Sequence, residues 1–389
     1  MLGQDFVESV EGKTRLLVPH SSLTSKVPPK WPAFFNPSAR LNRNLSMLAY
    51  RAFIGRLDGE KTFADSLTGI GARALRVAVE VPGIEQVYGN DVNPIAIEAA
   101  KNASAINSVA DKCTFSIAEV CKFLTDHATR EGERFGIVDL DPFGTPARHL
   151  DCMLRSVVDE GLVSVTATDN AVLCGIYPDV CFRRYYGKPL NNSYCNETAL
   201  RLLLSLLALT ASRLELSIKP VFAHANMHYF RVYAQVFVSS SGANKMPDNI
   251  GYMMHCFKCG NRLLREEKDC DSLRCKLCES RLTVGGQLWI KNLYDKEFIS
   301  KMASCEPDRE CRKVLDACAS ELDNIPYYFR VDEISSMLKT NPVSVFKMVE
   351  LLDKAGFAVS GTALNTGGFK TDARLDEILD IMKQKIARG

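Results

Sequence analysis

The sequence predicts an α/β fold with a mostly parallel sheet, followed by a smaller α+β domain at the C-terminus. Between about residues 61 and 170, short apolar runs alternate with segments of helical periodicity, which is typical of a parallel sheet covered by helices. The 389 residues exceed what one hydrophobic core usually serves. A small, polar run that contains a proline, "SSSGANKMPDN" at 239–249, indicates a boundary. We therefore predict one domain at 1–247 and a second at 248–389.

In the first domain, strands and helices are predicted to alternate. Strands are expected in 61–69, 86–93, 113–120, 135–141 and 162–169, with helices at 72–81 and 94–107. Pro94 lies in the first turn of its helix, where its missing N–H costs nothing. Two further strands in 220–240 could close the sheet edge. The apolar run 200–216 is interrupted by Arg201 and Arg213 and is too short to span a bilayer, which indicates a buried helix.

The second domain begins with a cysteine-rich segment and ends in a small helical unit at 326–389. The stretches "VDEISSMLK" and "VSVFKMVELLDKAG" are predicted as two helices joined by a tight turn at "TNP". The following "FAVSGTALNTGGFKT" could form a two-stranded wing. This unit is therefore expected to be winged-helix-like.

The composition is that of a soluble globular protein, with 46% apolar and 24% charged residues. A net charge of +2 provides no global basic field, so any nucleic-acid binding must use local patches. The N-terminus has acids and no apolar core of a secretory signal. The fourteen cysteines are therefore expected to be reduced thiols in the cytosol, some of them binding metal. We predict a cytoplasmic protein with no membrane association and no obligate protein partner.

The ends of the first two strands indicate a nucleoside-like cofactor, because parallel sheets bind ligands at the carboxyl ends of their strands. The stretch "DSLTGIGARALR" at 65–76 places a glycine turn there, although by itself it could be an ordinary strand–helix turn. Asp91 in "GNDVN" is placed to hold ribose hydroxyls. Ala72 and Arg73 follow Gly71 directly, so the six-residue glycine fingerprint of dinucleotide sites is absent. We therefore predict S-adenosylmethionine, which has no pyrophosphate.

The fourth strand ends in "DPFG", a sequence that suits an amine substrate on a flat base. The amine lone pair is delocalised into the base, so hydrogen-bond acceptors are needed to orient it towards the methyl donor. Asp141 can accept one N–H and the carbonyl of Pro142 a second, while Phe143 offers a face for stacking. The alternative is a structural Asx-Pro turn.

Upstream, "WPAFFNPSARLNRNLSMLAYR" at 31–51 combines aromatic residues with arginines. Phe34 or Phe35 could sandwich the base opposite Phe143, and Arg43 could bind the carboxylate of the cofactor. Taken alone, the stretch favours the start of a helix with a solvated basic face over a binding site.

Two Cys-x-x-Cys knuckles in the second domain predict a structural zinc ribbon at 256–278. The four ligands would be Cys256, Cys259, Cys275 and Cys278, whose spacing suits a closed tetrahedral Zn²⁺ site. Cys270 is a possible substitute ligand, and reduced cysteines that bind nothing are the alternative. His224 and His228 are expected to be packed or solvated.

With these motifs assembled, the chain resembles the tRNA guanine-N2 dimethyltransferases in their archaeal form. The resemblance is carried by "FFNPSARLNRN", "GARALR", "DPFGTPARHLD", the block at 166–201 and the cysteine pairs, and it weakens after about residue 300. It implies a Rossmann-like class I methyltransferase domain with a smaller C-terminal domain. It also implies that the enzyme transfers one and then two methyl groups from S-adenosylmethionine to N2 of guanine 26 in tRNA.

The resemblance also implies roles for individual residues. Asp141 would orient the amine, and Phe143 and Phe34 would stack on the guanine. The residues holding the cofactor would be Arg43, Arg73 and Asp91, with Ala118 and Glu119 at the adenine. The sequence "AEV" at 118–120 departs there from the family's usual Asp-Ala-Asn, and Glu119 is expected to compensate in part. "CFRRYYGKP" at 181–189 offers a basic, aromatic-flanked patch for the RNA backbone.

Two other functions are compatible with these motifs. One is an amino-methyltransferase acting on another base or on DNA, which the cysteine-rich segment and the block at 166–201 argue against. The other is a non-catalytic RNA-binding protein with a zinc ribbon and a decayed methyltransferase fold. The intact Asp91 and Asp141–Phe143 motifs argue against that.

Overall fold

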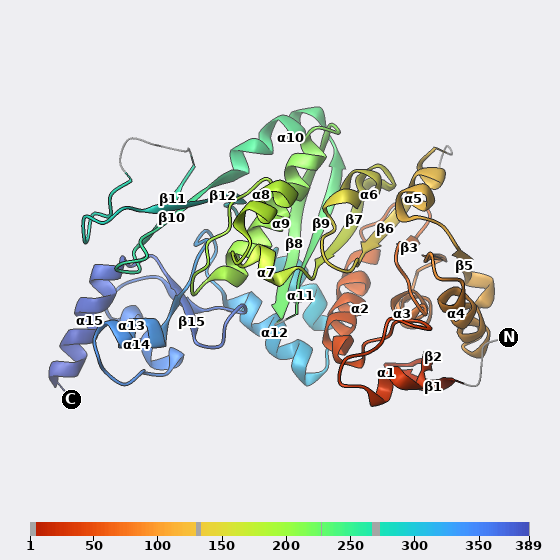
Figure 1. Cartoon of the computed structure of the whole chain (residues 1–389), viewed down its shortest axis with the longest axis horizontal. Helices are drawn as coiled ribbons and strands as arrows, with labels where there is room; N and C mark the ends of the chain where they lie inside the picture. Colours follow the sequence, from red (N-terminus) through yellow and green to blue (C-terminus); the bar gives the residue numbers. More distant parts are fainter. Residues whose placement is uncertain (1–4, 130–133, 227, 267–272, 389) are drawn as a thin grey trace.

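A seven-stranded sheet forms the centre of the protein (Figure 1), with strand order β5-β4-β3-β6-β7-β9-β8. The computed structural model describes every residue except 1–4, 130–133, 227, 267–272 and 389. The strands are β3 Thr62–Asp65, β4 Gln86–Asn90, β5 Cys113–Ser116, β6 Phe135–Leu140, β7 Val157–Ala167, β8 Leu216–Asn226 and β9 Tyr229–Val238. The first five run parallel, and β9 and β8 add to β7 as an antiparallel pair. The predicted, mostly parallel sheet with a hairpin at its edge is confirmed.

The helices form two layers because the chain crosses the sheet in two directions. From β3 the chain moves through β4 to β5, and then returns to β6 and β7 on the far side of β3. Right-handed crossovers in opposite directions put their helices on opposite faces. Accordingly α3 (Ala72–Glu80) contacts α2 (Arg40–Ile54) and α4 (Pro94–Ile106), whereas α6 (Leu150–Arg155) contacts α5 (Val120–Ala128) and α9 (Cys195–Ser212). The buried helix predicted in 200–216 is α9, almost all of which is buried.

An N-terminal hairpin that the sequence analysis did not predict covers α3 and α4. Its strands are β1 Phe6–Glu11 and β2 Thr14–Pro19, and the short helix α1 His20–Thr24 follows. Leu16 and Val18 pack into a small apolar cluster with Leu75 of α3 and Ala99 of α4. The hairpin also places the carboxylate of Glu11 against Arg43 of α2 and Arg76 of α3.

The C-terminal part carries a second sheet and the winged unit. The strands β10 Ile250–His255, β11 Arg262–Arg265 and β12 Thr283–Trp289 pair in the order β11-β10-β12. The winged unit has its own apolar core and consists of β13 Phe329–Arg330, α13 Val331–Met337, α14 Val345–Lys354, β14 Val359–Gly361, β15 Gly368–Thr371 and α15 Leu375–Arg388. The two helices and the wing match the prediction, while α15 was not predicted. Figure 1 shows this unit at the opposite end of the molecule from the N-terminal hairpin.

Between these parts, buried ion pairs join the winged unit to the central helix α9. Lys370 Nζ of β15 lies 2.9 Å from Glu197 Oε1 of α9 and 2.7 Å from Glu321 Oε1. Arg201 Nη2 is 2.7 Å from the same Glu197 oxygen. Breaking a buried pair leaves an uncompensated charge, so these contacts hold the winged unit in place on α9. The helices α11 Lys296–Ser304 and α12 Arg309–Ser320 pack on α2. In the described part of the chain, no helix is both long and apolar enough to cross a membrane.

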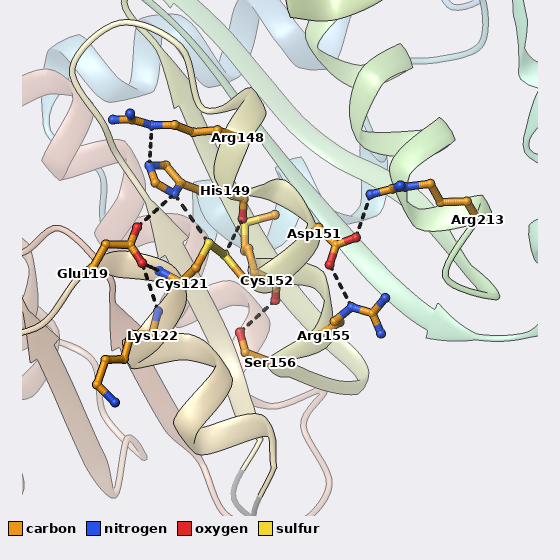
Figure 2. The surroundings of a disulfide bond; sticks show 11 residues. Glu119, Cys121, Lys122, Arg148, His149, Asp151, Cys152, Arg155, Ser156 and Arg213 are labelled. Atoms are coloured by element: carbon orange, nitrogen blue, oxygen red, sulfur yellow. Dashed lines mark hydrogen bonds and ion pairs between the residues drawn. A yellow bond between two sulfur atoms is a disulfide. The ribbon is translucent and has the colours of Figure 1, made fainter.

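One pair of cysteines departs from the expected reduced state. Cys121 in α5 and Cys152 in α6 form a disulfide with an S–S distance of 2.12 Å (Figure 2). His149 lies against it, with Nδ1 3.7 Å from Cys121 Sγ. The expectation of reduced thiols is therefore wrong for this pair, because α5 and α6 bring together two cysteines that are 31 residues apart. The other eleven described cysteines are free.

Candidate active site

A cavity of about 320 Å³ lies where the carboxyl ends of β3, β4, β6 and β7 meet. It is lined by residues from six separate segments, among them six of the predicted site residues: Phe34, Arg43, Arg73, Asp91, Asp141 and Phe143. The parallel sheet brings these segments together because each one follows a strand end or packs beside it. The cavity is therefore the candidate site of the predicted chemistry.

The glycine turn after β3 shapes one wall of the cavity and fixes Asp91. Gly69 and Gly71 both have left-handed φ values, of 54° and 79°. A Cβ atom on Gly71 would lie 2.9 Å from the Cβ of Ala100, so the turn requires glycine there. Asp91 accepts hydrogen bonds at 2.9 Å from the backbone N–H of Gly69 and of Asn93. Its carboxylate is therefore held at the end of β4, facing the cavity.

Asp141 is held by Arg73 rather than standing alone. Arg73 Nη2 lies 2.8 Å from Asp141 Oδ2, and Arg73 Nη1 lies 3.2 Å from Asp139 Oδ1. The guanidinium is buried and also donates to the side chain of Asn42. Arg73, which itself lines the cavity, thus binds two carboxylates and orients Asp141. Its predicted contact with the cofactor stays a prediction.

The two aromatic rings expected to sandwich a base touch each other instead. The ring centroids of Phe34 and Phe143 are 4.8 Å apart, and the rings are nearly perpendicular at 83°. A flat base between them requires parallel rings that lie further apart, so at least one of the two rings must turn. Gly144, which follows it, has a left-handed φ of 78° and donates its N–H to Thr168 Oγ1 at 2.6 Å. That bond anchors the loop behind an exposed ring.

Arg43 is paired within the protein. Its Nε and Nη2 atoms lie 2.6 and 2.5 Å from the two carboxylate oxygens of Glu11, which comes from the N-terminal hairpin. Its guanidinium also lies over the ring of Phe35, 5.0 Å from the centroid. The helix expected in this stretch is α2, but Arg43 on it is buried rather than solvated. Its predicted contact with the carboxylate of the cofactor stays a prediction.

The structure adds a residue that the sequence analysis missed, Asp65 at the end of β3. Its side chain is buried, lines the cavity and receives a hydrogen bond from Thr68 Oγ1 at 3.0 Å, while Oδ1 has no partner among the described residues. Burial, and then the nearby charge of Asp139, raise the pKa of Asp65 to about 7. A buried carboxyl with one unpartnered oxygen, in the wall of a cavity, favours a cationic ligand. The signal in the sequence was the acid that closes the apolar strand "TFAD".

Two predicted cofactor residues lie outside the lining of the cavity. Glu119 caps α5, because its Oε2 accepts hydrogen bonds from the backbone of Cys121 and Lys122 at 2.8 and 3.1 Å. The carbonyl of Ala118 accepts a hydrogen bond from Asn90 Nδ2 at 3.0 Å. Their contacts with an adenine stay predictions. Of the two histidines, His224 is buried and packs on Phe222, and His228 is exposed at the cavity.

The four predicted metal ligands converge at the second sheet. The sulfur atoms of Cys256, Cys259, Cys275 and Cys278 all lie within 4.8 Å of one another. The two knuckles have the same backbone form, since Gly260 N donates to Cys256 O and Glu279 N donates to Cys275 O, both residues with left-handed φ. Four thiols in two matching knuckles fit a tetrahedral metal site. Cys270 lies outside the described residues.

A family model described as N2,N2-dimethylguanosine tRNA methyltransferase matches residues 12–383. The chain belongs to this family. It is 34% identical over 386 residues to a tRNA (guanine(26)-N(2))-dimethyltransferase of Methanothermobacter thermautotrophicus, covering 96% of this chain and 97% of the relative. It is 30% identical to a tRNA (guanine(26)-N(2)/guanine(27)-N(2))-dimethyltransferase of Aquifex aeolicus, covering 96% and 95%.

A solved structure of the same family supports the fold along nearly the whole chain. The structure of Trm1 from Pyrococcus horikoshii, described as a complex with S-adenosyl-L-methionine, superposes with a TM-score of 0.83 at 26% identity. It covers 96% of this chain and 99% of that protein. The Rossmann-like methyltransferase domain expected from the family resemblance is confirmed.

Proposed function

We propose that the protein is a tRNA (guanine26-N2)-dimethyltransferase that uses S-adenosylmethionine. The observation that carries the proposal is the convergence, in one cavity, of Asp141–Phe143 with the carboxylates of Asp65 and Asp91, in a chain that belongs to this family. When bound, the cofactor supplies an electrophilic methyl group on a positively charged sulfur. The remaining chemistry is positioning, and this chain's own side chains perform it.

The amine of guanine is oriented by Asp141 and the carbonyl of Pro142. Of the two carboxylate oxygens of Asp141, Arg73 donates to Oδ2 and not to Oδ1, as far as the described residues show. Oδ1 therefore stays available to one substrate N–H. The Pro142 carbonyl accepts the other. After the first transfer a single N–H remains, and one of the two acceptors suffices to orient the second transfer. Stacking of the base on Phe143, with Phe34 on its other face, keeps the amine in the plane of these acceptors.

Two carboxylates with different hydrogen-bonding partners hold the cofactor. Asp91, which is fixed by backbone donors, suits the ribose hydroxyls, while the partnerless oxygen of Asp65 suits the cationic groups of S-adenosylmethionine. The predicted contacts of Arg43, Arg73, Ala118 and Glu119 belong to the same proposal. So do the domains 1–247 and 248–389, the cytoplasmic location, and the lack of an obligate protein partner.

Nucleoside mass spectrometry tests the proposal. Unmodified tRNA transcript is incubated with the protein and S-adenosylmethionine, beside a transcript in which adenine replaces guanine 26. We expect dimethylguanosine only in the first, and mapping of the product separates position 26 from position 27. No methylated guanosine in either, from protein that binds the cofactor, would refute the proposal and indicate another nucleic-acid substrate.

We also propose that the cysteine cluster binds a structural Zn²⁺ ion. Replacing Cys256 and Cys259 by Ser removes one knuckle, because a serine hydroxyl does not ligate Zn²⁺ as a thiolate does. We expect about one equivalent less zinc by elemental analysis and a lower melting temperature, with the single-turnover rate changed far less. Cys305→Ser, at a free cysteine outside the cluster, should leave the zinc content unchanged. If the Cys256/Cys259 double variant held as much zinc as the Cys305→Ser variant, the proposal of a zinc site in the cysteine cluster would be wrong.

Cofactor binding should depend on pH through Asp65. Its pKa of about 7 in the free protein means that a positively charged ligand, which prefers the anionic carboxylate, binds better as pH rises and releases a proton. Lowering the pH from 8 to 6 should therefore weaken the binding of S-adenosylmethionine about tenfold. Calorimetry in buffers of different ionisation enthalpy measures both effects. Asp65→Asn should bind weakly at each pH without this dependence, and a wild-type Kd that is flat with pH would contradict the assignment.

A further inference from the structure

A second hollow, of about 480 Å³, lies between α8 (Pro178–Tyr185) and the sheet β11-β10-β12. It shares no lining residue with the candidate active site. The side chains that give it its character are Phe182, Tyr186, Lys188, Tyr252 and Gln287. The described lining thus combines three aromatic rings, one cation and one amide, and contains no acid.

Tyr186 exposes a large aromatic ring at the end of α8. It ends α8 with a left-handed φ of 52°, a position where glycine is preferred because a Cβ atom crowds the backbone. Its side chain is 61% exposed, so burial does not offset that cost. The neighbouring Tyr185, by contrast, is fully buried and donates to Asp169 at 2.6 Å. The ring of Tyr186 is thus not part of the core and is open to a ligand in the hollow.

A second exposed aromatic ring lies on the same side of the helix. Phe182 is 50% exposed and lies four residues before Tyr186, whose N–H donates to the Phe182 carbonyl at 2.9 Å. Tyr252 of β10 faces them from the second sheet as part of the same hollow. Aromatic faces of this kind accept a nucleobase of any identity.

Backbone hydrogen bonds fix the floor of the hollow. Lys188 and Gly286 exchange backbone hydrogen bonds of 2.7 and 2.8 Å, which ties the segment after α8 to β12. A Cβ atom on Gly286 would lie 2.7 Å from the carbonyl of Gly251, so the strands approach closely there. Gln287 Nε2 lies 3.4 Å from the hydroxyl of Tyr252. The amide can offer its second N–H and its carbonyl oxygen to a base edge.

Positive charge lies beside the rings. Lys188 is exposed in the hollow, and Arg183, which is also exposed, follows Phe182 on α8. Cations next to aromatic rings fit a nucleotide, because its phosphate can pair with the cations while its base stacks on the rings. α8 is also tied to the active site, because Arg184 lies 3.2 Å from Asp169, which follows the cavity residue Thr168. A ligand held at α8 is thus held at a set position relative to the Asp141 loop.

We propose that this hollow binds one unstacked nucleotide of the tRNA, distinct from the guanine that is methylated. The inference rests on the proposed function, since it takes tRNA as the substrate. The contact gives the tRNA a second fixed point, so that the target guanine enters the cavity in register. It acts on substrate binding rather than on the transfer step itself.

Tyr186→Gly is the decisive variant, because glycine suits the left-handed backbone and the fold should keep or gain stability. Loss of one stacking partner should raise the Kd and the KM for unmodified tRNA transcript about 5- to 150-fold. We expect kcat within about twofold of wild type and an unchanged Kd for S-adenosylmethionine. Phe182→Ala should act in the same direction, and Tyr186→Phe should restore binding.

Salt dependence separates stacking from phosphate contact. Tyr186→Gly should weaken binding by the same factor at low and high salt, because stacking releases no counterions, whereas Lys188→Gln should reduce the salt slope. Ser108→Gly is the matched control, an exposed residue with a left-handed φ of 55° just after α4. Its tRNA affinity should equal that of the wild type.

Wild-type tRNA affinity in both Tyr186→Gly and Phe182→Ala would overturn this inference and leave a protein partner as the occupant. If the wild type methylates guanine 26 while these variants bind normally, only the second site is refuted. If the wild type binds tRNA through Tyr186 but methylates no guanosine, the proposed function fails and the second site stands.

Discussion

Replacing Asp141 by Ala should abolish methyl transfer while tRNA binding stays nearly unchanged. The carboxylate lies at the cavity, with a quarter of its side chain exposed, and it supplies the acceptor that aims the amine lone pair. Loss of a positioned hydrogen-bonding group that acts in the transition state typically lowers kcat by about 10²- to 10³-fold. Single-turnover kinetics with saturating enzyme measures the transfer step, and filter binding measures the affinity for tRNA.

The fold should tolerate this change because Arg73 keeps other partners. It retains Asp139 Oδ1 at 3.2 Å and Asn42 Oδ1 at 3.1 Å, so its buried charge is not left alone. Asp151→Ala is a matched control, since Asp151 is a carboxylate ten residues further on that pairs with Arg155 and Arg213 on the surface. It should turn over at the wild-type rate. Normal turnover by Asp141→Ala would refute the proposed mechanism.

Local patterns sufficed to predict the sheet and the motifs at its strand ends. The apolar runs that became β3, β4 and β6 each end in an acid or lead into one, namely Asp65, Asp91 and Asp141. Parallel pairing places those ends at one edge, so the position of the cavity follows from topology. The cysteine knuckles could also be predicted from the sequence, because each lies within four consecutive residues.

Contacts between distant segments were not predictable in this way. The partner of Arg43 is Glu11, 32 residues earlier, on a hairpin whose strands gave no recognised signal. The Cys121–Cys152 disulfide depends on how α5 and α6 pack. The raised pKa of Asp65 depends on burial and on the charge of Asp139. In the sequence Asp139 is only one polar residue within an apolar strand. Spacing along the chain carries no information on such pairs.

Arg231→Met should be among the most destabilising single changes in this protein. Arg231 and Asp139 are fully buried and form an ion pair, and Arg231 also donates to Thr166 Oγ1 at 2.6 Å and Tyr233 Oη at 2.8 Å. Removing one partner of a buried pair costs about 3–5 kcal/mol. Asp139 would keep the contact with Arg73 Nη1 at 3.2 Å but would lose its nearer, fully buried cation. Urea unfolding at pH 7.5 should show this loss. Arg213→Met, which removes an exposed arginine paired with Asp151, should cost no more than about 1 kcal/mol.

The pH dependence identifies the cause of that loss. Burial raises the pKa of Asp139, but the charges of Arg231 and Arg73 outweigh burial and hold the pKa below its usual value. The pair therefore stabilises the fold above the unfolded pKa, and this contribution is lost as pH falls through the folded pKa. In Arg231→Met the pKa of Asp139 should rise, so the destabilisation should be smaller at pH 5 than at pH 7.5. Asp139→Asn combined with Arg231→Met should recover part of the stability, since neither charge remains.

A destabilisation by Arg231→Met that is equal at both pH values would indicate lost packing instead. Because Asp139 lies two residues before Asp141 and shares Arg73 with it, the same buried charges that stabilise the sheet also position the substrate acceptor.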